Sequence, residues 1–566
     1  MNKLRRIVSN TLISLFGQFV TWTSTLILTI AYGRFLGDVK FGELYFAITF
    51  VSLLGTPIEF GFNQQLTRDV AEDPEKAHAY LWNTLLIKVT LWVFMYAIIL
   101  FLSLMLGYSP EQRGIVAICG LTLLSGSIGN IFASLHYAFE RTLYPAVGMI
   151  LEKGLSAIVG FLLLKYGATV QVMALVLLGG SFIDAIWQAL WFFRLTGRHI
   201  VIRKKVLRDL VRNSIPFVVS AALGVIYYRI DTVLLSLMTS AAVVGWYGAG
   251  YRLFDTLFFI PSIIISAVMF PIFSKLSADL NSRSTLKMAV EKSMNLLVIC
   301  AIPIASLFIV AAPNIIGFLY HRPEFVNTVP VVQALAPGVV FLYINSLFFN
   351  IIISIRGEKK VPIMSAAALI FNLGLNLYLI PRYQQVGAAV VTSLTELLLL
   401  CISFFYVPKY LLPQKSFKVM VKVVIAAFVM SLVVLLMRGL TILLIIPIAL
   451  LVYGGAAILL RTVPREDIRV LFSALGSKDK RIPSQVLTNI VDEGIYLQTT
   501  DRLPVVKRAT EDPGSAKVEA CESGAACDDD EITERRPIIK KRDMSAILAQ
   551  PGDFFQHFIH NNQDGI

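Results

Sequence analysis

Ionisable side chains occur inside long apolar stretches of this sequence, where each is costly to keep. A charge at the centre of a bilayer costs at least about 2.5–3.5 kcal/mol, so such residues are candidates for function. They are Glu59, Lys88, Glu152, Lys153, Asp184, Arg229, Asp231, Arg252, Asp255 and Glu396. In apolar surroundings a cation attracts anionic groups, and a desolvated carboxylate exchanges a proton or helps to bind Na⁺. This chemistry is binding and ion coupling, and we predict no catalytic residue.

Four of these residues lie close together in the sequence. Arg229 and Asp231 are two positions apart, about 200° around a helix, so they cannot share a face. Arg252 and Asp255 are three positions apart, so they share a face and can neutralise each other, in a functional or a purely structural ion pair. Asp231 shares its face with a row of small and polar residues: Ser220, Gly224 and Tyr227.

Uncharged polar residues form two long stripes at helical spacing. One consists of Asn10, Ser14, Gln18, Thr21 and Thr25, and the other of Ser127, Asn130, Ser134 and Tyr137. Such stripes either hydrogen-bond to neighbouring helices or line a water-filled cavity. Because the stripes occur together with cations in both halves of the chain, we expect a central hydrophilic cavity.

Membrane-spanning helices are the elements that must position these residues. Of the 566 residues, 15% are charged and 56% are hydrophobic, and the mean hydropathy is +0.71. A soluble domain carries about 25% charged residues, and a helix of about 20 apolar residues crosses a bilayer. We therefore predict an all-α integral membrane protein of about fourteen spans. Their ranges are 10–32, 42–62, 80–106, 114–138, 144–164, 169–193, 214–238, 243–274, 291–311, 329–353, 361–380, 386–407, 418–437 and 441–460. The eighth is long, so we expect it to tilt or to protrude.

The loops between these spans differ in basic charge. Alternate loops hold about 26 and about 7 Lys and Arg residues. Since cytoplasmic loops are the basic ones, both the N- and C-termini are expected in the cytoplasm of a multi-pass protein of the plasma (inner) membrane. The same asymmetry explains the net charge of +13, so we predict no nucleic-acid partner.

A basic segment, residues 194–213, separates the first six spans from the next six. Its apolar residues fall at helical spacing (Val206, Leu207, Leu210 and Val211), which is typical of an interfacial helix, although a solvated basic loop also fits. A faint echo links the two halves, since Phe41–Tyr45 reads FGELY and Val244–Tyr247 reads VGWY. Together these features predict two six-helix bundles that are parallel pseudo-repeats.

The predicted organisation has five parts. They are a six-helix bundle (1–193), a basic linker (194–213), a second six-helix bundle (214–407), two additional spans (408–465) and a mostly disordered cytoplasmic tail (466–566). The five cysteines are scattered, with no CxxC pair and no histidine at ligand spacing. We therefore expect neither a disulfide framework nor a metal site.

Several motifs resemble those of a known family. They are Tyr228-Arg-Ile-Asp-Thr-Val-Leu-Leu235, Val244-Gly-Trp-Tyr-Gly-Ala-Gly-Tyr-Arg-Leu-Phe-Asp255 with Pro261 and Pro271, and Leu36-Gly-Asp-Val-Lys-Phe-Gly-Glu-Leu-Tyr45 with Glu59-Phe-Gly-Phe62. In their order, and with the plan of six, six and two spans, they resemble the polysaccharide transporter branch (O-antigen and oligosaccharide flippases) of the multidrug/oligosaccharidyl-lipid/polysaccharide (MOP) superfamily. The resemblance covers about residues 1–460 and leaves the tail unmatched.

The resemblance implies a function. Members of this branch flip polyprenyl-pyrophosphate-linked oligosaccharides from the cytoplasmic to the outer leaflet by alternating access of two bundles, driven by Na⁺ or H⁺. Candidate residues for binding the pyrophosphate and sugar are Arg229, Arg252, Lys88, Lys153, Asn10, Gln18, Asn130 and Tyr227. Candidates for ion coupling are Asp231, Asp255 and Glu152. No other cofactor is expected.

Other functions stay open at this point. A multidrug cation antiporter of the same superfamily would favour acidic residues in its cavity, and a peptidoglycan-precursor flippase shares the plan of fourteen spans. A membrane glycan polymerase or ligase usually needs a large outer loop, whereas the largest outer loop here is about 312–328. A scaffold that recruits polysaccharide-synthesis proteins through its tail would leave the intramembrane charges unexplained. The expected partners are a lipid-linked glycan, membrane lipids and, through the tail, such synthesis proteins, and the expected state is a monomer.

Overall fold

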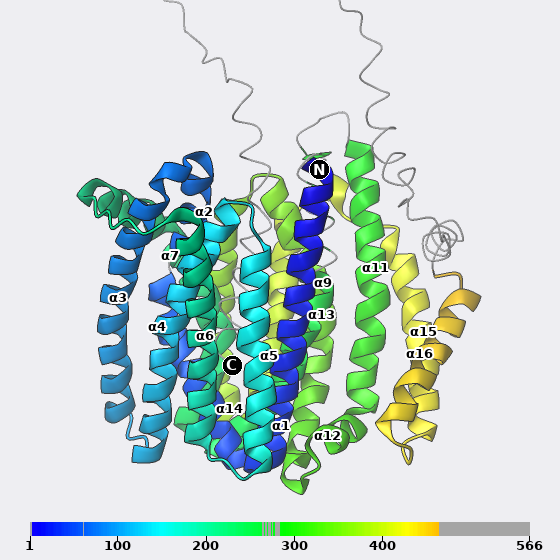
Figure 1. Cartoon of the computed structure of the whole chain (residues 1–566). Helices are drawn as coiled ribbons and strands as arrows, with labels where there is room; N and C mark the ends of the chain where they lie inside the picture. The colour runs from blue at the N-terminus through cyan, green and yellow to red at the C-terminus, as the bar shows by residue number, and fades with distance from the viewer. Residues whose placement is uncertain are drawn as a thin grey trace, which may run out of the picture. The chain divides into compact units, whose positions relative to one another are not determined.

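The computed structural model describes residues 3–462, apart from residue 60 and most of residues 263–282 (Figure 1). Within this part every regular element is a helix, which confirms the predicted all-α class. The predicted tail, residues 466–566, lies outside the described residues.

The first half begins with a bent helix, α1. Gly37 lies in the left-handed region at φ 81°, which glycine adopts without a steric penalty, and it divides α1 into two arms. These arms are the first two predicted spans. The helices of this half are α1 (Lys3–Glu59), α2 (Phe62–Glu72), α3 (Ala77–Met105), α4 (Pro110–Ala138), α5 (Leu143–Lys165) and α6 (Val170–Thr196).

The second half contains a similarly bent helix, α14, whose arms join at Gln384 with φ 47°. The eighth predicted span, 243–274, begins as α8 and continues as the short helix α9, and its last residues are largely outside the described part. The helices after α6 are α7 (Lys204–Met238), α8 (Ala241–Leu257), α9 (Phe259–Pro261), α11 (Arg283–Val310), α12 (Ala312–Tyr320), α13 (Val329–Ser354), α14 (Val361–Tyr406), α15 (Ser416–Leu436) and α16 (Ile442–Leu459).

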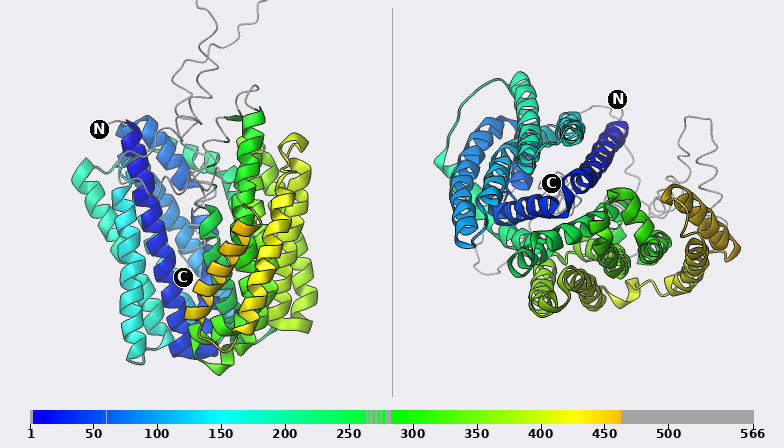
Figure 2. Two further views of the ribbon diagram at one scale, coloured as in Figure 1. Left: turned by 90° about the vertical axis from the view of Figure 1, so that its right-hand side faces the viewer. Right: turned by 90° about the horizontal axis from the view of Figure 1, so that it is seen from below.

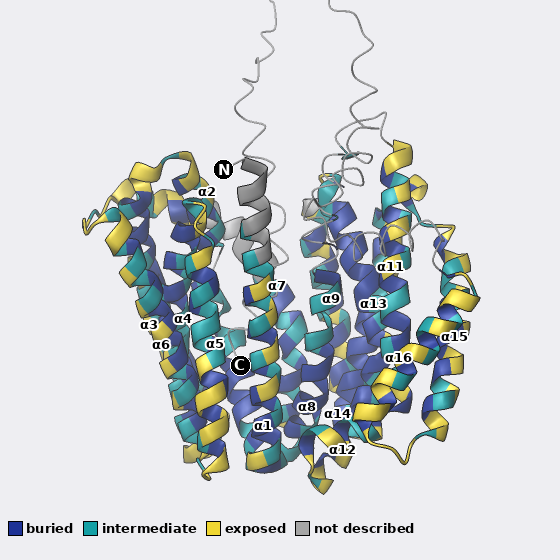
Figure 3. Ribbon diagram, turned by 45° about the vertical axis from the view of Figure 1, so that its right-hand side comes forward, coloured by how far each residue is buried: buried dark blue, intermediate teal, exposed yellow. Residues whose placement is uncertain are grey.

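The predicted spans agree with these helices. Ten stretches of the described residues are long and apolar enough to cross a membrane. The described helices reach the predicted number of fourteen when the arms of α1 and α14 are counted separately and α7 and α8, which are not among these ten stretches, are added. Large apolar side chains such as Phe94, Phe161, Phe405 and Leu451 are exposed on their outer surfaces, as Figure 3 shows for the exposed faces of α15 and α16. Such surfaces are normal against lipid and would be unusual against water.

Helices from the two halves pack against one another through α1. Within the first half α4 packs on α6, and α1 packs on α5; within the second half α13 packs on α14, and α14 on α7. Both α7 and α8 pack on α1 and so join the halves. The last two helices lie at the side of the second half, where α15 packs on α11 and α16 packs on α15 (Figure 2). The predicted domain boundaries stay predictions.

The basic linker is partly the beginning of α7. Three of its four apolar residues lie in a hydrophobic cluster with residues of α2, α3 and α6: Val206, Leu207 and Leu210. Leu210 is fully buried, whereas Val211 is exposed. The helical spacing is therefore confirmed, but most of the apolar face is covered by protein rather than by lipid.

Gly42 and Gly245, the glycines of the sequence echo, meet across the two halves. A Cβ on Gly42 would collide with the carbonyl oxygen of Ala241, and a Cβ on Gly245 would collide with that of Asp38. The two contacts are reciprocal, because Ala241 lies four residues before Gly245 and Asp38 lies four residues before Gly42. This reciprocal contact brings the backbones of α1 and α8 together as small residues do in membrane helix pairs, and it is the relation expected of pseudo-repeats.

Candidate functional site

Lys88 is buried between helices of the first half. Its Nζ lies 2.9 Å from Oε2 of Glu59, which is on α1, and 3.0 Å from Oδ1 of Asn63, which is on α2. Asn63 also donates to Glu59 at 2.9 Å. Lys88 is 1% exposed, so its charge is balanced inside the protein by this ion pair.

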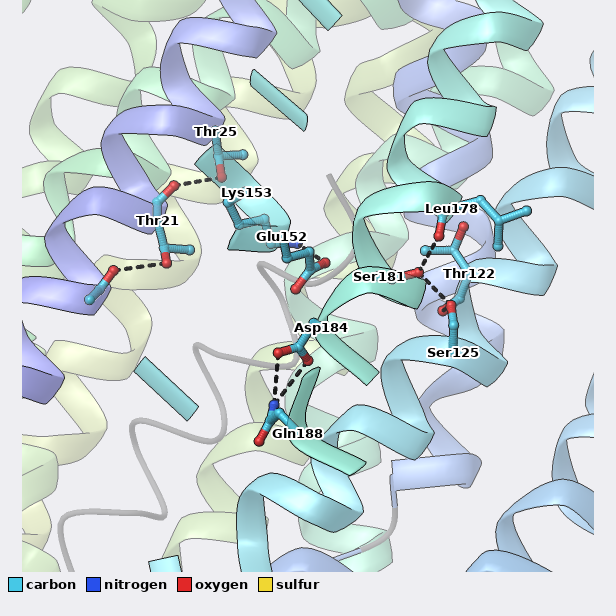
Figure 4. A network of polar contacts seen from close by, with 11 residues as sticks. Thr21, Thr25, Thr122, Ser125, Glu152, Lys153, Leu178, Ser181, Asp184 and Gln188 are labelled. Carbon is cyan, nitrogen blue, oxygen red and sulfur yellow. Dashed lines mark hydrogen bonds and ion pairs between the residues drawn. The ribbon is translucent and has the colours of Figure 1, made fainter. Parts of the chain in front are cut away.

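Further buried polar residues lie on α5 and α6 (Figure 4). Lys153 lies 3.0 Å from Glu152, and on α6 the carboxylate of Asp184 accepts hydrogen bonds of 2.8 and 3.0 Å from Gln188. Gly148 on α5 and Gly129 on α4 pack directly against the Asp184 carboxylate, where any larger side chain would collide with it. The two glycines therefore make room for a buried charge.

A third group of charges lies between α7 and α8. Arg229 Nη1 is 3.5 Å from Oδ2 of Asp255. The expected pair of Arg252 with Asp255 does not form, because the side chain of Arg229 reaches Asp255 from the neighbouring helix. Arg252 is 2% exposed and makes no ion pair within the described residues, and its Nε has no hydrogen-bond partner.

Arg252 lies near residues of the first half as well. The hydroxyl of Tyr45, on α1, is buried without a hydrogen-bond partner, and this side chain interacts electrostatically with both Arg229 and Arg252. Arg229 is nine residues before the end of α7 and Arg252 is eleven residues after the start of α8. At 1.5 Å per residue both lie roughly 14–17 Å from that end of the bundle, near the middle of a bilayer core of about 30 Å.

Asp231 faces a different set of groups from Arg229, as the spacing predicts. Its carboxylate accepts a hydrogen bond from the Tyr247 hydroxyl on α8 and a 3.4 Å bond from Thr392 on α14. Tyr227, one turn earlier, also points to α14, where its hydroxyl donates to Glu396 at 2.5 Å. The predicted shared face of Asp231 and Tyr227 is therefore confirmed, and it packs on α14 and α8.

The two polar stripes differ in their surroundings. Hydroxyls of Thr21 and Thr25 bond to carbonyls one turn earlier in their own helix, so these residues are satisfied locally. Asn10 donates to the Glu140 carbonyl at 3.3 Å, which ties α1 to the segment after α4. Gln18 and Asn130 are half-buried. The predicted cavity-lining role of these residues stays a prediction.

Some polar partners were not identified from the sequence. Tyr247, Thr392 and Asn345 contact the buried carboxylates, yet each is an ordinary member of an apolar stretch. One pattern in the sequence could have indicated them: Thr392 and Glu396 are four residues apart, so they form a polar face on α14.

Known proteins share parts of this sequence. Residues 7–277 match the family model described as polysaccharide biosynthesis protein. The chain is 28% identical over 195 residues to an uncharacterized membrane protein, MJ1068, of Methanocaldococcus jannaschii, covering 34% of this chain and 38% of that protein's length. It is 21% identical over 385 residues to the probable low-salt glycan biosynthesis flippase Agl15 of Haloferax volcanii, covering 64% of this chain and 75% of that protein.

Solved structures share the fold. The lipid II flippase MurJ in an inward closed conformation superposes with a TM-score of 0.66 at 17% identity, covering 80% of this chain and 99% of that chain. An inward-facing multidrug resistance MATE family transporter of the MOP superfamily superposes with a TM-score of 0.56 at 15% identity, covering 68% and 93%. Residues 7–277 of this multi-pass membrane protein therefore resemble the polysaccharide biosynthesis protein family, and the chain shares the fold of these MurJ and MATE transporters.

Proposed function

We propose that the protein flips a polyprenyl-pyrophosphate-linked oligosaccharide from the cytoplasmic to the outer leaflet of the plasma membrane. The observation that carries this proposal is Arg252, a guanidinium buried at mid-depth whose Nε has no hydrogen-bond partner. A buried cation that lacks an anionic partner is costly, and a pyrophosphate would supply that partner through bidentate hydrogen bonds. The family and the similarity to a glycan biosynthesis flippase support the same substrate class.

The position of Arg252 suits alternating access. Tyr45 of the first half interacts electrostatically with Arg229 and Arg252 of the second half, where α1 packs on α7 and α8. A head group bound there would contact both halves, so its binding would affect their relative movement. In this mechanism Asp231 and Asp255 are the coupling candidates. Asp255 pairs with Arg229, and Asp231 accepts a hydrogen bond from Tyr247 on another face of α7.

A peptidoglycan-precursor flippase is the second candidate. The similarity in fold to the lipid II flippase favours it. Both candidates predict a role for Arg252, because both substrates carry a pyrophosphate, and they differ in the sugar that the protein accepts. The proposed partners of either activity are the lipid-linked glycan, surrounding lipids and a coupling Na⁺ or H⁺.

The test uses the purified full chain in liposomes that contain a fluorescent polyprenyl-pyrophosphate oligosaccharide. A membrane-impermeant enzyme that modifies the sugar reports how much substrate reaches the outer leaflet. We expect Arg252→Ala to slow flipping at least about tenfold, because hydrogen bonds to a charged group contribute about 1.5–3 kcal/mol. Arg252→Lys retains the positive charge without the bidentate geometry, so its rate of flipping should lie between those of the wild type and Arg252→Ala.

Arg382→Ala is the matched control. Arg382 is an arginine in the bend region of α14, stacked on Tyr378 at 3.8 Å, and its removal should leave flipping unchanged. Absence of flipping under every imposed Na⁺ and proton gradient, together with gradient-driven uptake of organic cations, would replace the proposal with a multidrug antiporter.

A further inference from the structure

Glu396 is a buried carboxylate in the membrane-spanning part of α14. It is 1% exposed. The Tyr227 hydroxyl of α7 donates to its Oε1 at 2.5 Å, and Asn345 Nδ2 of α13 donates to its Oε2 at 2.8 Å. The same amide nitrogen donates to the Glu396 backbone carbonyl at 2.9 Å. Two neighbouring helices, α7 and α13, therefore hold this side chain in a defined position.

The partners of Glu396 are neutral. Within the described part of the chain, no Lys, Arg or His nitrogen lies within 4.0 Å of its carboxylate, whereas Glu59, Glu152 and Asp255 each lie beside a cation. Asp231 is likewise held by hydroxyl groups, from Tyr247 and Thr392. A buried carboxylate without a counter-ion is stabilised by taking up a proton. Na⁺ fits this position poorly, because the partners present N–H and O–H hydrogens to the carboxylate rather than oxygen lone pairs.

Tyr227 can also serve the protonated form. A phenol oxygen both donates and accepts, so a rotated Tyr227 hydroxyl can accept the hydrogen bond of a protonated Glu396 while Asn345 still donates to Oε2 and to the backbone carbonyl. Both charge states of Glu396 can therefore be satisfied by the same two neighbours.

A path of interactions links Glu396 to the proposed substrate-binding arginines. The rings of Tyr227 and Tyr228 have centroids 4.3 Å apart, and Tyr228 interacts electrostatically with Glu396, Asp255 and Arg229. The charge on Glu396 therefore acts on Tyr228, which directly precedes Arg229 in α7 and also interacts with Asp255.

Other charged groups near α14 are engaged elsewhere. From α7, Glu396 faces Tyr227 and Tyr228, and from α13 it faces the uncharged Asn345. On α8, Tyr247 is bound to Asp231 and Asp255 to Arg229. On α14 itself, the polar residue one turn earlier is Thr392, which contacts Asp231.

We propose that Glu396 is the proton-carrying carboxyl that couples a proton gradient to movement of the substrate. One proton binds the carboxylate when the site opens to one side and leaves when it opens to the other, and no other bond changes. Each event changes the charge of Glu396 by one unit, and Tyr228 interacts electrostatically with this carboxyl and with the Arg229–Asp255 pair, so the two conformations are biased differently. The inference rests on the proposed flipping activity but names a group outside the predicted coupling residues.

The first arm of the test needs no substrate. Infrared spectra of the purified full chain, titrated with pH in detergent, report the carbonyl band of a protonated carboxyl. We expect a buried-carboxyl component of this band in the wild type that is lost in Glu396→Gln and kept in Glu111→Gln, an exposed acid in the first turn of α4. Persistence of the whole band in Glu396→Gln would overturn the inference.

The second arm measures flipping in liposomes with and without an imposed pH gradient. We expect the gradient to accelerate the wild type several-fold, to leave Glu396→Gln unaffected, and to accelerate Glu396→Asp, which keeps a carboxyl. A full gradient response in folded Glu396→Gln would refute the role of Glu396 while leaving the flippase proposal intact. Absence of flipping in the wild type would refute the flippase proposal, and the infrared arm would then decide whether Glu396 binds a proton.

Tyr227→Phe keeps the test decisive where Glu396→Gln fails to fold. This variant removes one hydroxyl that donates to the carboxylate. It should shift the midpoint of the infrared titration upward, because the charged form loses a hydrogen bond. An unchanged midpoint would contradict the inference.

Discussion

Arg34 and Arg322 each donate hydrogen bonds to backbone carbonyls of the other half of the chain. Arg322 Nε donates to the carbonyl of Arg34 at 2.6 Å, and Arg34 donates to the carbonyls of Leu319 and Phe318, the latter at 2.5 Å. Arg34 precedes the bend of α1, whereas Arg322 follows α12 in the other half. The pair therefore joins the two halves at the end of the bundle that we predict to be outer.

Loss of this connection should favour opening at that end. Because each hydrogen bond to a charged group contributes about 1.5–3 kcal/mol, we expect Arg322→Ala to raise the open population about tenfold or more. Spin labels at the exposed positions Val39 and Val326, with the native cysteines replaced, measure the separation of α1 from the segment after α12. Distance distributions that match between Arg322→Ala and its parent would contradict this role, and Arg382→Ala serves as the control.

Gly42→Ala should destabilise the protein. Its Cβ would collide with the Ala241 carbonyl and lie 2.8 Å from the Gly245 nitrogen, so α1 and α8 would have to separate. Overpacking of this kind costs about 1–3 kcal/mol. Thermal unfolding in detergent should show a lower midpoint. Gly114→Ala is the matched control, since no atom lies within 4 Å of its Cβ and the midpoint should stay the same or rise.

Lys88→Met should also destabilise the protein, by about 3–5 kcal/mol, because it leaves the carboxylate of Glu59 without its cation. The double variant Lys88→Met/Glu59→Gln removes both charges and should recover much of the loss. The thermal midpoints of the wild type, the two single variants and the double variant together form a double-mutant cycle, which measures the coupling between Lys88 and Glu59. Strictly additive effects would show that the pair is not coupled.

The basic loops predict the orientation of the chain. A single cysteine at Ile200, which is 73% exposed, should react with a membrane-impermeant maleimide only after the cells are permeabilised. A single cysteine at Tyr166, which is 84% exposed, should react in intact cells. Both are introduced into a chain whose native cysteines are replaced. The opposite pattern would invert the proposed topology and the direction of flipping.

Hydropathy by itself predicted most of the spans of this protein. An apolar stretch must be helical to satisfy its backbone in lipid, so the prediction depends only on neighbouring residues. Predicted span 329–353 corresponds to α13, Val329–Ser354, and 144–164 corresponds to α5, Leu143–Lys165. The same local reasoning correctly separated the faces of Arg229 and Asp231.

The tertiary structure decided which charges meet. Spacing along α8 favours a pair of Arg252 with Asp255, but the observed partner of Asp255 is Arg229, because the crossing of α7 and α8 brings a second arginine within reach. The echo around Gly42 and Gly245 indicated a repeat, whereas only the packing of α1 on α8 reveals that the two glycines touch. Ion pairs and close helix contacts depend on how helices far apart in sequence cross, and no local pattern in one helix contains that information.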